Sequence, residues 1–141
     1  MEPPLILITN DDGIESAGLW AAVRAALPLG EVLVVAPDRQ WSGGGRSMPR
    51  GVTGRLVRAD RVVDGVRVEA YAVDASPALA VDHGVVEIAP RRPALVISGA
   101  NFGANLSIEV TISGTVGAAL EGSAFGIPAL AVSLEMDAAY H

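Results

Sequence analysis

The first 36 residues hold two buried-strand patterns with an amphipathic-helix pattern between them, and this order restricts the fold more than any other feature. Leu5 to Thr9 is an apolar run that ends in turn residues, and Glu31 to Ala36 is a second apolar run. Between them, apolar residues recur at helical spacing from Ser16 to Leu27, with Pro28 just beyond the end. Strand, helix and strand in this order form the unit of a parallel sheet with a right-handed crossover.

The rest of the chain continues this alternation and adds one antiparallel element. From Val52 to Val73 the pattern turns towards alternating residues around the pair Asp64-Gly65, which is typical of a β-hairpin. The later predicted elements are a helix from Ser76 to about Ile88, a strand from Ala94 to Ser98, a helix from Thr115 to Phe125 and a strand from Ala129 to Leu134. Together they predict an α/β protein with a mostly parallel sheet, flanking helices and a β-hairpin insertion.

The composition narrows the possible chemistry. The chain has 141 residues, about one domain, and we treat 1–141 as a single domain. Ten basic residues, all Arg, and sixteen acidic ones give a net charge of -6, which argues against nucleic-acid polymers and anionic membranes as partners. The lack of Lys and Cys excludes lysine and thiolate chemistry.

No apolar run approaches the ~20 residues of a membrane span, and the start lacks a basic signal region, so we expect a cytoplasmic protein.

Two consecutive carboxylates, Asp11 and Asp12, follow the first predicted strand. Two ionised groups this close repel each other, so a folded site either protonates one or recruits a cation. Oxygen donors of this kind suit a hard divalent ion such as Mg²⁺ or Mn²⁺. The alternative is a turn at a helix start with no ligand.

The second polar loop, residues 37 to 51, is longer than a connector requires. It supplies Ser42 as a neutral oxygen ligand, and its glycines allow backbone N–H groups to approach an anion. The alternative is a plain flexible loop. The chain contains neither the glycine fingerprint of dinucleotide-binding folds after its first strand nor a P-loop, which weakens both of those hypotheses.

The third polar loop follows the strand that ends at Ser98. Asn101 offers an uncharged carbonyl ligand and Asn105 an amide donor, and Ser113-Gly114-Thr115 begins the next predicted helix. Hydroxyls and free N–H groups at a helix start favour a bound phosphate. The alternative is that these residues only form turns and cap the helix. In open parallel sheets, ligands bind beyond the carboxyl ends of the strands, and all three polar loops are predicted to lie at that edge.

The aromatic residues and histidines are given smaller roles. We expect Trp20 to pack in the core, and Trp41 either to stack on a base or, more in keeping with loop aromatics, to cover an apolar patch. His83 and the terminal His141 have no partner at metal-ligand spacing, so we interpret them as packing or solvent-facing residues.

Four stretches, taken together, resemble the SurE family, the survival proteins that act as 5'/3'-nucleotidases and acid phosphatases. They match in the family's order and approximate spacing. The matching stretches are Ile8 to Ile14, Val34 to Gly43, Ile97 to Leu106 and Ser113 to Gly122. The resemblance implies a Rossmann-like domain that holds one divalent metal ion.

Carried onto this chain, the resemblance places the metal on Asp11, Asp12, Ser42 and Asn101. It places the substrate phosphate near Asn10, Asn105 and the turn Ser113-Gly114-Thr115. The implied reaction is metal-assisted attack of water on a nucleoside monophosphate, with Asp11 or Asp12 also handling a proton. A homodimer or higher homo-oligomer is the implied assembly.

The chain also departs from the family pattern. Ser107, Glu109 and Ile112 stand where the family usually has glycine, aspartate and tyrosine, and the chain stops at His141, where relatives continue with a carboxyl-terminal portion. We therefore expect either a truncated chain or a shortened relative. A second hypothesis is a non-catalytic nucleotide- or metal-binding module derived from the same fold.

Overall fold

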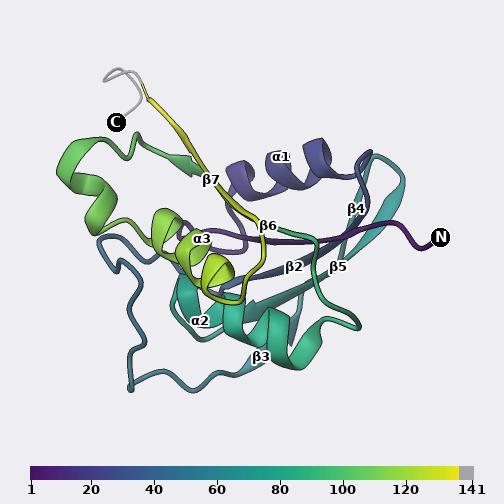
Figure 1. Cartoon of the computed structure of the whole chain (residues 1–141), viewed down its shortest axis with the longest axis horizontal. Helices are drawn as coiled ribbons and strands as arrows, with labels where there is room; N and C mark the ends of the chain where they lie inside the picture. Colours follow the sequence, from purple (N-terminus) through teal and green to yellow (C-terminus); the bar gives the residue numbers. More distant parts are fainter. Residues whose placement is uncertain (137–141) are drawn as a thin grey trace.

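The structure is a computed structural model that describes residues 1–136, and it forms a seven-stranded sheet with helices on both faces (Figure 1). The strand order is β3-β5-β2-β1-β6-β7, with β4 paired to β5. The elements are β1 (Leu5–Thr9), α1 (Ala17–Ala26), β2 (Glu31–Pro37), β3 (Leu56–Arg58), β4 (Arg61–Val63), β5 (Val66–Val73), α2 (Pro77–Asp82), the π-helical turn η1 (His83–Ile88), β6 (Leu95–Phe102), the 3₁₀ turn η2 (Ser107–Thr111), α3 (Gly114–Ala124) and β7 (Ala129–Leu134). Within the described residues, no helix has the length and apolar character required to cross a membrane.

The predicted strand–helix–strand unit is confirmed, and it places β1 at the centre of the sheet between β2 and β6. The chain steps from β1 to β2 in one direction across the sheet, and from β5 through β6 to β7 in the other. Right-handed crossovers in opposite directions put their helices on opposite faces. Figure 1 accordingly shows α1 on one side of the sheet, with α2 and α3 on the other.

The predicted β-hairpin is present, but its second strand is more than an insertion. Asp64 and Gly65 both adopt positive φ at the turn, as the sequence indicated. Val66 to Val68 pair with β4, whereas Glu69 to Val73 pair in parallel with β2. Three of the eight residues of β5 therefore pair within the hairpin, and the other five pair within the main sheet.

Strand β6 extends beyond its predicted end at Ser98 and reaches Phe102, with an irregularity in its pairing to β7 between Ser98 and Asn101. Gly99 has φ +134°, and a Cβ there would lie 2.3 Å from the carbonyl oxygen of Val132. The glycine that suggested a loop instead allows the strand to continue beside β7. Asn101 is consequently held on a strand.

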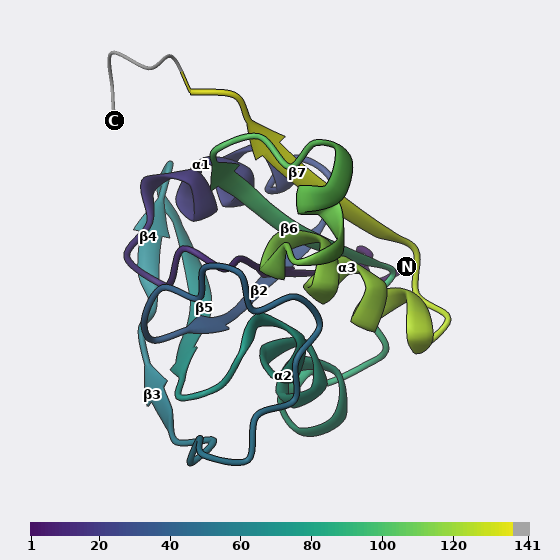
Figure 2. The ribbon, with the colours of Figure 1, turned by 90° about the vertical axis from the view of Figure 1, so that its left-hand side faces the viewer.

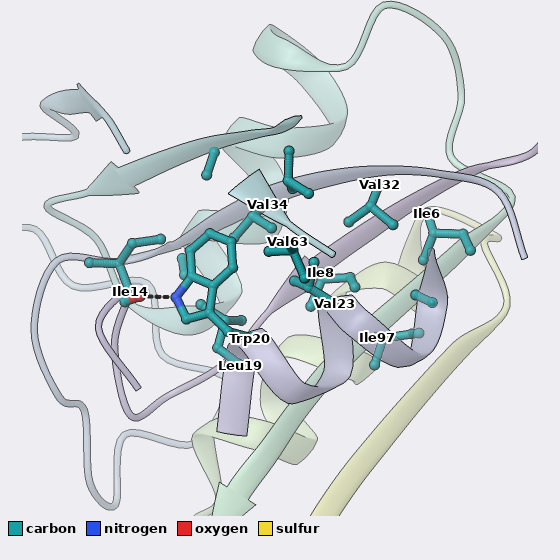
Figure 3. Close-up of a cluster of buried hydrophobic side chains, with 14 of the residues drawn as sticks. Ile6, Ile8, Ile14, Leu19, Trp20, Val23, Val32, Val34, Val63 and Ile97 are labelled. Carbon is teal, nitrogen blue, oxygen red and sulfur yellow. Dashed lines mark hydrogen bonds between the residues drawn. The ribbon is translucent and has the colours of Figure 1, made fainter. Parts of the chain in front are cut away.

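Each face of the sheet has its own apolar core. On the α1 face, Trp20 is buried as predicted, and its Nε1 donates to the carbonyl oxygen of Ile14 at 2.7 Å (Figure 3). On the other face, Leu7 and Val96 pack among residues of α2 and α3. The side chain of His83 is only 18% exposed, as expected of a packing residue, and its Nδ1 lies 3.2 Å from Oε2 of Glu87. The expectation for His141 concerns a residue outside the described part of the chain.

The close contact between α1 and β6 yields a stability prediction. A Cβ on Gly18 would lie 2.1 Å from the carbonyl oxygen of Ala100, and backbone cannot yield as a flexible side chain does. We expect Gly18→Ala to lower the free energy of unfolding by about 1–3 kcal/mol, although Ala favours a helix by about 1 kcal/mol. Urea unfolding measures the change. Gly51→Ala, where a Cβ meets nothing within 4 Å, is the control, and equal stability of both variants would contradict the packing argument.

Candidate metal and phosphate site

A cavity of about 330 Å³ opens at the carboxyl edge of the sheet, where such folds bind ligands. Four chain segments surround it: the end of β1, the loop after β2, the end of β6, and the approach to α3. Its lining residues are Asp11, Ser42, Gly43, Asn101, Phe102, Gly103, Ala104, Asn105, Glu109, Ile112 and Ser113. The structure therefore brings together five of the side chains that the sequence selected, from positions about one hundred residues apart in the chain.

Asp11 is the most buried acidic group of this cavity, with 8% of the residue exposed. Burial raises the pKa of its carboxyl to about 6, and the charge of Asp12 adds to this, while Thr115 acts in the opposite direction. Its Oδ1 is buried without a hydrogen-bond partner among the described residues. A buried carboxylate oxygen left unpaired is a costly arrangement that a bound cation would relieve.

The side chain of Asp12, which follows β1, accepts a hydrogen bond from the backbone of β6. Its Oδ2 accepts a hydrogen bond from the backbone N–H of Phe102 at 3.0 Å. The carboxyl of Asp12 is not among the groups that line the cavity, so one predicted metal ligand lies at the margin of the site. This contact fixes the end of β6 relative to the two carboxylates.

Asn101 and Ser42 reach the cavity from two different segments, the end of β6 and the loop after β2. Asn101 is 9% exposed, and its Nδ2 donates to the carbonyl oxygen of Gly103 at 2.9 Å, which orients the side-chain amide and leaves its oxygen available as a ligand. Ser42 follows Trp41, whose backbone N–H donates to the carbonyl oxygen of Asp11 at 2.7 Å. The loop that carries Ser42 is thus tied directly to the turn that carries the aspartates.

The donors at this place fit a hard divalent cation. Carboxylate, amide and hydroxyl oxygens are the ligands that Mg²⁺ and Mn²⁺ take in proteins. Within residues 1–136, no group of three or more His, Cys, Asp or Glu side chains is placed to hold a metal. A metal bound here would therefore rely on the neutral oxygens of Ser42 and Asn101 as well as on the aspartates.

The residues predicted to bind phosphate divide into two groups. Ser113 and Asn105 line the cavity. The Ser113 side chain caps α3 by accepting from the N–H of Val116, and Asn105 Nδ2 donates to Ser133 Oγ at 2.6 Å. The start of an eleven-residue helix at the cavity offers backbone N–H groups and a favourable dipole to an anion.

Asn10, Gly114 and Thr115 are not among the residues that line the cavity. Both ends of the Asn10 amide bond to the backbone of Gly13, so this buried side chain shapes the turn that presents the aspartates. A Cβ on Gly114 would lie 2.8 Å from the Cβ of Asp11, and Thr115 is fully buried beside the same carboxyl. For these three residues the structure supports a positioning role, and direct contact with phosphate stays a prediction.

The loop of residues 38–51 is anchored on α3 by contacts that the sequence did not indicate (Figure 2). Gly45 N–H donates to the carbonyl oxygen of Ile112 at 2.8 Å, and a Cβ on Gly117 would lie 2.3 Å from the carbonyl oxygen of Gly45. Arg46 Nε lies 2.6 Å from Oε2 of the buried Glu121. Burial, together with the neighbouring Glu121, raises the pKa of Asp82 to about 7.

Three lining residues complete the cavity wall. Phe102, Glu109 and Ile112 face it, and the last two are positions where the sequence departs from the family pattern. Phe102 gave no signal beyond its place next to Asn101. Trp41 is not among the lining residues, and the Arg39 guanidinium lies 4.9 Å from its ring centroid. Both roles considered for Trp41, base stacking and covering an apolar patch, stay predictions.

This fold and cavity define a Rossmann-like α/β protein with an oxygen-lined pocket at the carboxyl edge of its sheet. The family model described as Survival protein SurE matches residues 6–141, and the chain belongs to that family. This finding confirms the resemblance carried by the four sequence stretches.

Relatives and a solved structure agree with this assignment. Proteins named 5'-nucleotidase SurE from Methanopyrus kandleri and Thermococcus gammatolerans are 53% and 50% identical over 93% and 94% of this chain. The chain covers only 49% and 48% of those proteins, so it spans about half their length. The crystal structure of the SurE protein from Aquifex aeolicus matches with a TM-score of 0.75 and 39% identity, over 96% of this chain and 52% of that one.

The raised pKa of Asp11 predicts how metal affinity depends on pH. A carboxyl must lose its proton to bind a metal, so the proton competes with the ion below a pKa of about 6. We expect the apparent affinity for Mn²⁺ to be about tenfold weaker at pH 5 than at pH 7. Calorimetric titration at both values tests this, and Asp11→Asn should remove most of the difference. An affinity equal at both pH values would show that Asp11 does not titrate with the ion.

The anchor of Arg46 on Glu121 yields a second prediction. Removing the cation leaves the buried Glu121 carboxylate beside Asp82 without its ion-pair partner, while Arg46 itself is half exposed, so we expect Arg46→Met to cost about 1–2 kcal/mol of stability. The double variant Arg46→Met/Glu121→Gln should recover most of this loss. Arg24→Met breaks the exposed pair with Asp64 and should cost less than about 0.5 kcal/mol. If the stability losses of Arg46→Met and Glu121→Gln simply add in the double variant, the two side chains do not interact, and the anchoring of the loop through Arg46 would be contradicted.

Proposed function

We propose that this chain carries the site of a metal-dependent phosphomonoesterase that hydrolyses nucleoside monophosphates. The observation that carries the proposal is the meeting of Asp11, Ser42, Asn101 and Ser113 in one cavity at the carboxyl edge of the sheet. The names of the relatives, 5'-nucleotidase SurE, support the same activity. The chain spans about half the length of those proteins, so their activity is proposed for this protein and is not taken over from their names.

In this proposal Asp11, Asp12, Ser42 and Asn101 hold one Mg²⁺ or Mn²⁺ ion. When bound, such an ion supplies Lewis-acid chemistry at a phosphoryl oxygen and activates water. Asn105, Ser113 and the N–H groups at the start of α3 bind the phosphate oxygens.

Asp11 or Asp12 also takes or gives a proton during the reaction. The pKa of about 6 of the Asp11 carboxyl is its value without an ion, and binding of a cation favours the ionised form; the contact of Asp12 with Phe102 holds the second carboxyl in a fixed orientation. Asn10, Gly114 and Thr115 position Asp11 and do not line the cavity themselves. The chemistry therefore depends on side chains that the turn after β1 and the start of α3 position together.

We further propose a homodimer or higher homo-oligomer that acts in the cytoplasm. Strand β7 forms one edge of the sheet, and Leu130 and Leu134 on it are half exposed. An exposed apolar edge strand favours association with further protein. This edge supports a larger assembly than one copy of the described residues.

A second candidate is a non-catalytic module that binds a nucleotide or a metal. The residues Glu109 and Ile112, which depart from the family pattern and line the cavity, favour it. Both candidates use the same cavity, so turnover is the property that separates them. Tight calorimetric binding of a nucleoside monophosphate without release of phosphate would establish the module.

The test of the enzyme measures phosphate released from nucleoside monophosphates with Mg²⁺ or Mn²⁺. We expect activity that chelation abolishes and that Asp11→Asn lowers by more than about 100-fold, since even residues that support a metal ligand are worth 10–100-fold. The matched control is Asp64→Asn, which makes the same chemical change at the exposed turn of the β-hairpin. Activity that survives both chelation and Asp11→Asn would remove the proposed mechanism.

A further inference from the structure

The loop of residues 38–51, which carries Ser42, is held by Arg46 at two acidic side chains. Arg46 Nε lies 2.6 Å from Oε2 of Glu121, and the carboxyl of Asp82 on α2 is a neighbour of the same Glu121 side chain. We propose that Asp82 and Glu121 form an acid pair that shares one proton, and that the charge of this acid pair sets how firmly Arg46 holds the loop on α3. The inference rests on the proposed function only for the role of Ser42 at the metal and phosphate cavity.

The acid pair is shielded from water between two helices. Helices α2 and α3 pack against each other (Figure 2), Glu121 is 7% exposed, and Oδ1 of Asp82 is buried without a hydrogen-bond partner among the described residues. Two ionised carboxylates repel each other in such a place, so a single proton between them is the favoured state. Burial and the neighbouring Glu121 raise the pKa of Asp82 to about 7, so this proton is lost in the neutral range of pH.

Few other charges face the acid pair. Arg46 approaches Asp82 from the loop, and His83 follows it in the chain at the start of η1. His83 is itself paired with Glu87 at 3.2 Å. Strands β1 and β2 also pack against α2, and the side chains that they contribute to this core are apolar: Leu5, Leu7, Leu33 and Val35. The charge that reaches the acid pair from the loop is therefore that of Arg46.

The position of Arg46 and the proton on Asp82 influence each other. Burial and Glu121 raise the pKa of Asp82, whereas the guanidinium of Arg46 acts in the opposite direction. Coupling between two equilibria is reciprocal, so the ionised form of Asp82 favours the bound position of Arg46. The acid pair carries one negative charge below pH 7 and two above it. Arg46 therefore holds the loop more firmly as the pH rises through 7.

Backbone contacts next to Arg46 connect this hold to Ser42. The N–H of Gly45 donates to the carbonyl oxygen of Ile112 at 2.8 Å, and a Cβ on Gly117 would lie 2.3 Å from the carbonyl oxygen of Gly45. Ser42 lies only three residues before Gly45, and it lines the cavity. When Arg46 leaves the acid pair, this stretch of the loop loses the ion pair that keeps it against α3. Asp82, Glu121 and Arg46 are in this sense positioning residues for Ser42.

The stability of the whole fold depends on the same proton with the opposite sign. A carboxyl whose pKa is raised by folding binds its proton more tightly in the folded state. The ionisation of Asp82 therefore lowers the free energy of unfolding as the pH rises from about 4 through about 7. If Asp82 served general stability alone, the loop would loosen with the rest of the fold as the pH rises. The proposed role predicts that the loop is held more firmly over the same range, so the sign separates the two roles.

Hydrogen exchange of the Gly45 amide, followed by NMR on the metal-free chain, tests the proposal. Each rate is compared with the intrinsic rate at the same pH, so that the resulting protection factor reports only the opening of the loop. We expect the protection factor of Gly45 to rise about threefold from pH 6 to pH 8, which corresponds to about 0.7 kcal/mol and is of the size expected for a partly exposed ion pair. The amide of Val96, which donates to the carbonyl oxygen of Pro128 at 2.9 Å, should show no such rise.

Three variants assign the effect to the acid pair. Asp82→Asn keeps the shape of the protonated carboxyl, so the protection of Gly45 should no longer rise with pH, and any contribution from His83 would persist in this variant. Arg46→Met removes the cation and should abolish the rise as well. Asp64→Asn makes the same chemical change at the exposed turn of the β-hairpin, and as the matched control it should keep the rise.

The outcomes decide the inference independently of the proposed function, because the measurement requires neither metal nor substrate. A protection factor of Gly45 that falls or stays constant from pH 6 to pH 8 would overturn the acid pair. A rise that persists in Asp82→Asn or Arg46→Met, or one that Asp64→Asn also removes, would overturn it too. If Gly45 and the variants behave as expected but the chain releases no phosphate from nucleoside monophosphates, the proposed function fails and the acid pair stands.

Discussion

The burial of one carboxyl group at the end of the central strand is the constraint on which the rest of the site depends. Asp11 is enclosed by the start of α3, where Gly114 permits a contact that no side chain would allow, and by the backbone of Trp41. This enclosure raises the pKa of the carboxyl and leaves one oxygen without a protein partner. A group in that state is suited to an ion or a proton, and both roles need the neighbouring segments to be held close.

The neighbouring segments are held at the site by close approaches of backbone and by a few polar side chains. The loop that bears Ser42 meets α3 at Gly45 and Gly117, where a Cβ would collide, and Arg46 then reaches the buried Glu121. On the other side, Asp12 holds the N–H of Phe102. Small residues allow these segments to approach each other closely, and the polar contacts of Arg46 and Asp12 hold them there. Ser42 and Asn101 are thereby brought to the same cavity from segments far apart in the chain.

Much of this arrangement follows from the sequence, because its causes are local. The apolar run before Asn10, the turn residues after it and the helical spacing up to Leu27 fixed the position of the aspartates at a strand end. What the sequence did not reveal depends on contacts made across the fold. The glycine at 99 indicated a loop, yet the strand continues through it because Val132 of β7 lies alongside. Thr115 carried the same signal as an exposed capping residue, and only the packing of α3 shows that its hydroxyl is buried.

The order of the strands places two cavities next to each other at the carboxyl edge of the sheet. The chain moves from β1 to β2 on one side and reaches β6 on the other, so the helices on either side of this switch point cover opposite faces of the sheet. At the carboxyl ends of β1 and β6 this leaves a polar space beside the start of α3 and an apolar space beside the start of α1. The polar space has Asp11, Ser42 and Ser113 in its lining, whereas the apolar space has Ala17, Ala21 and Leu134. The reversal in strand order that separates the helices thus also separates a polar pocket from an apolar one at the same edge of the sheet.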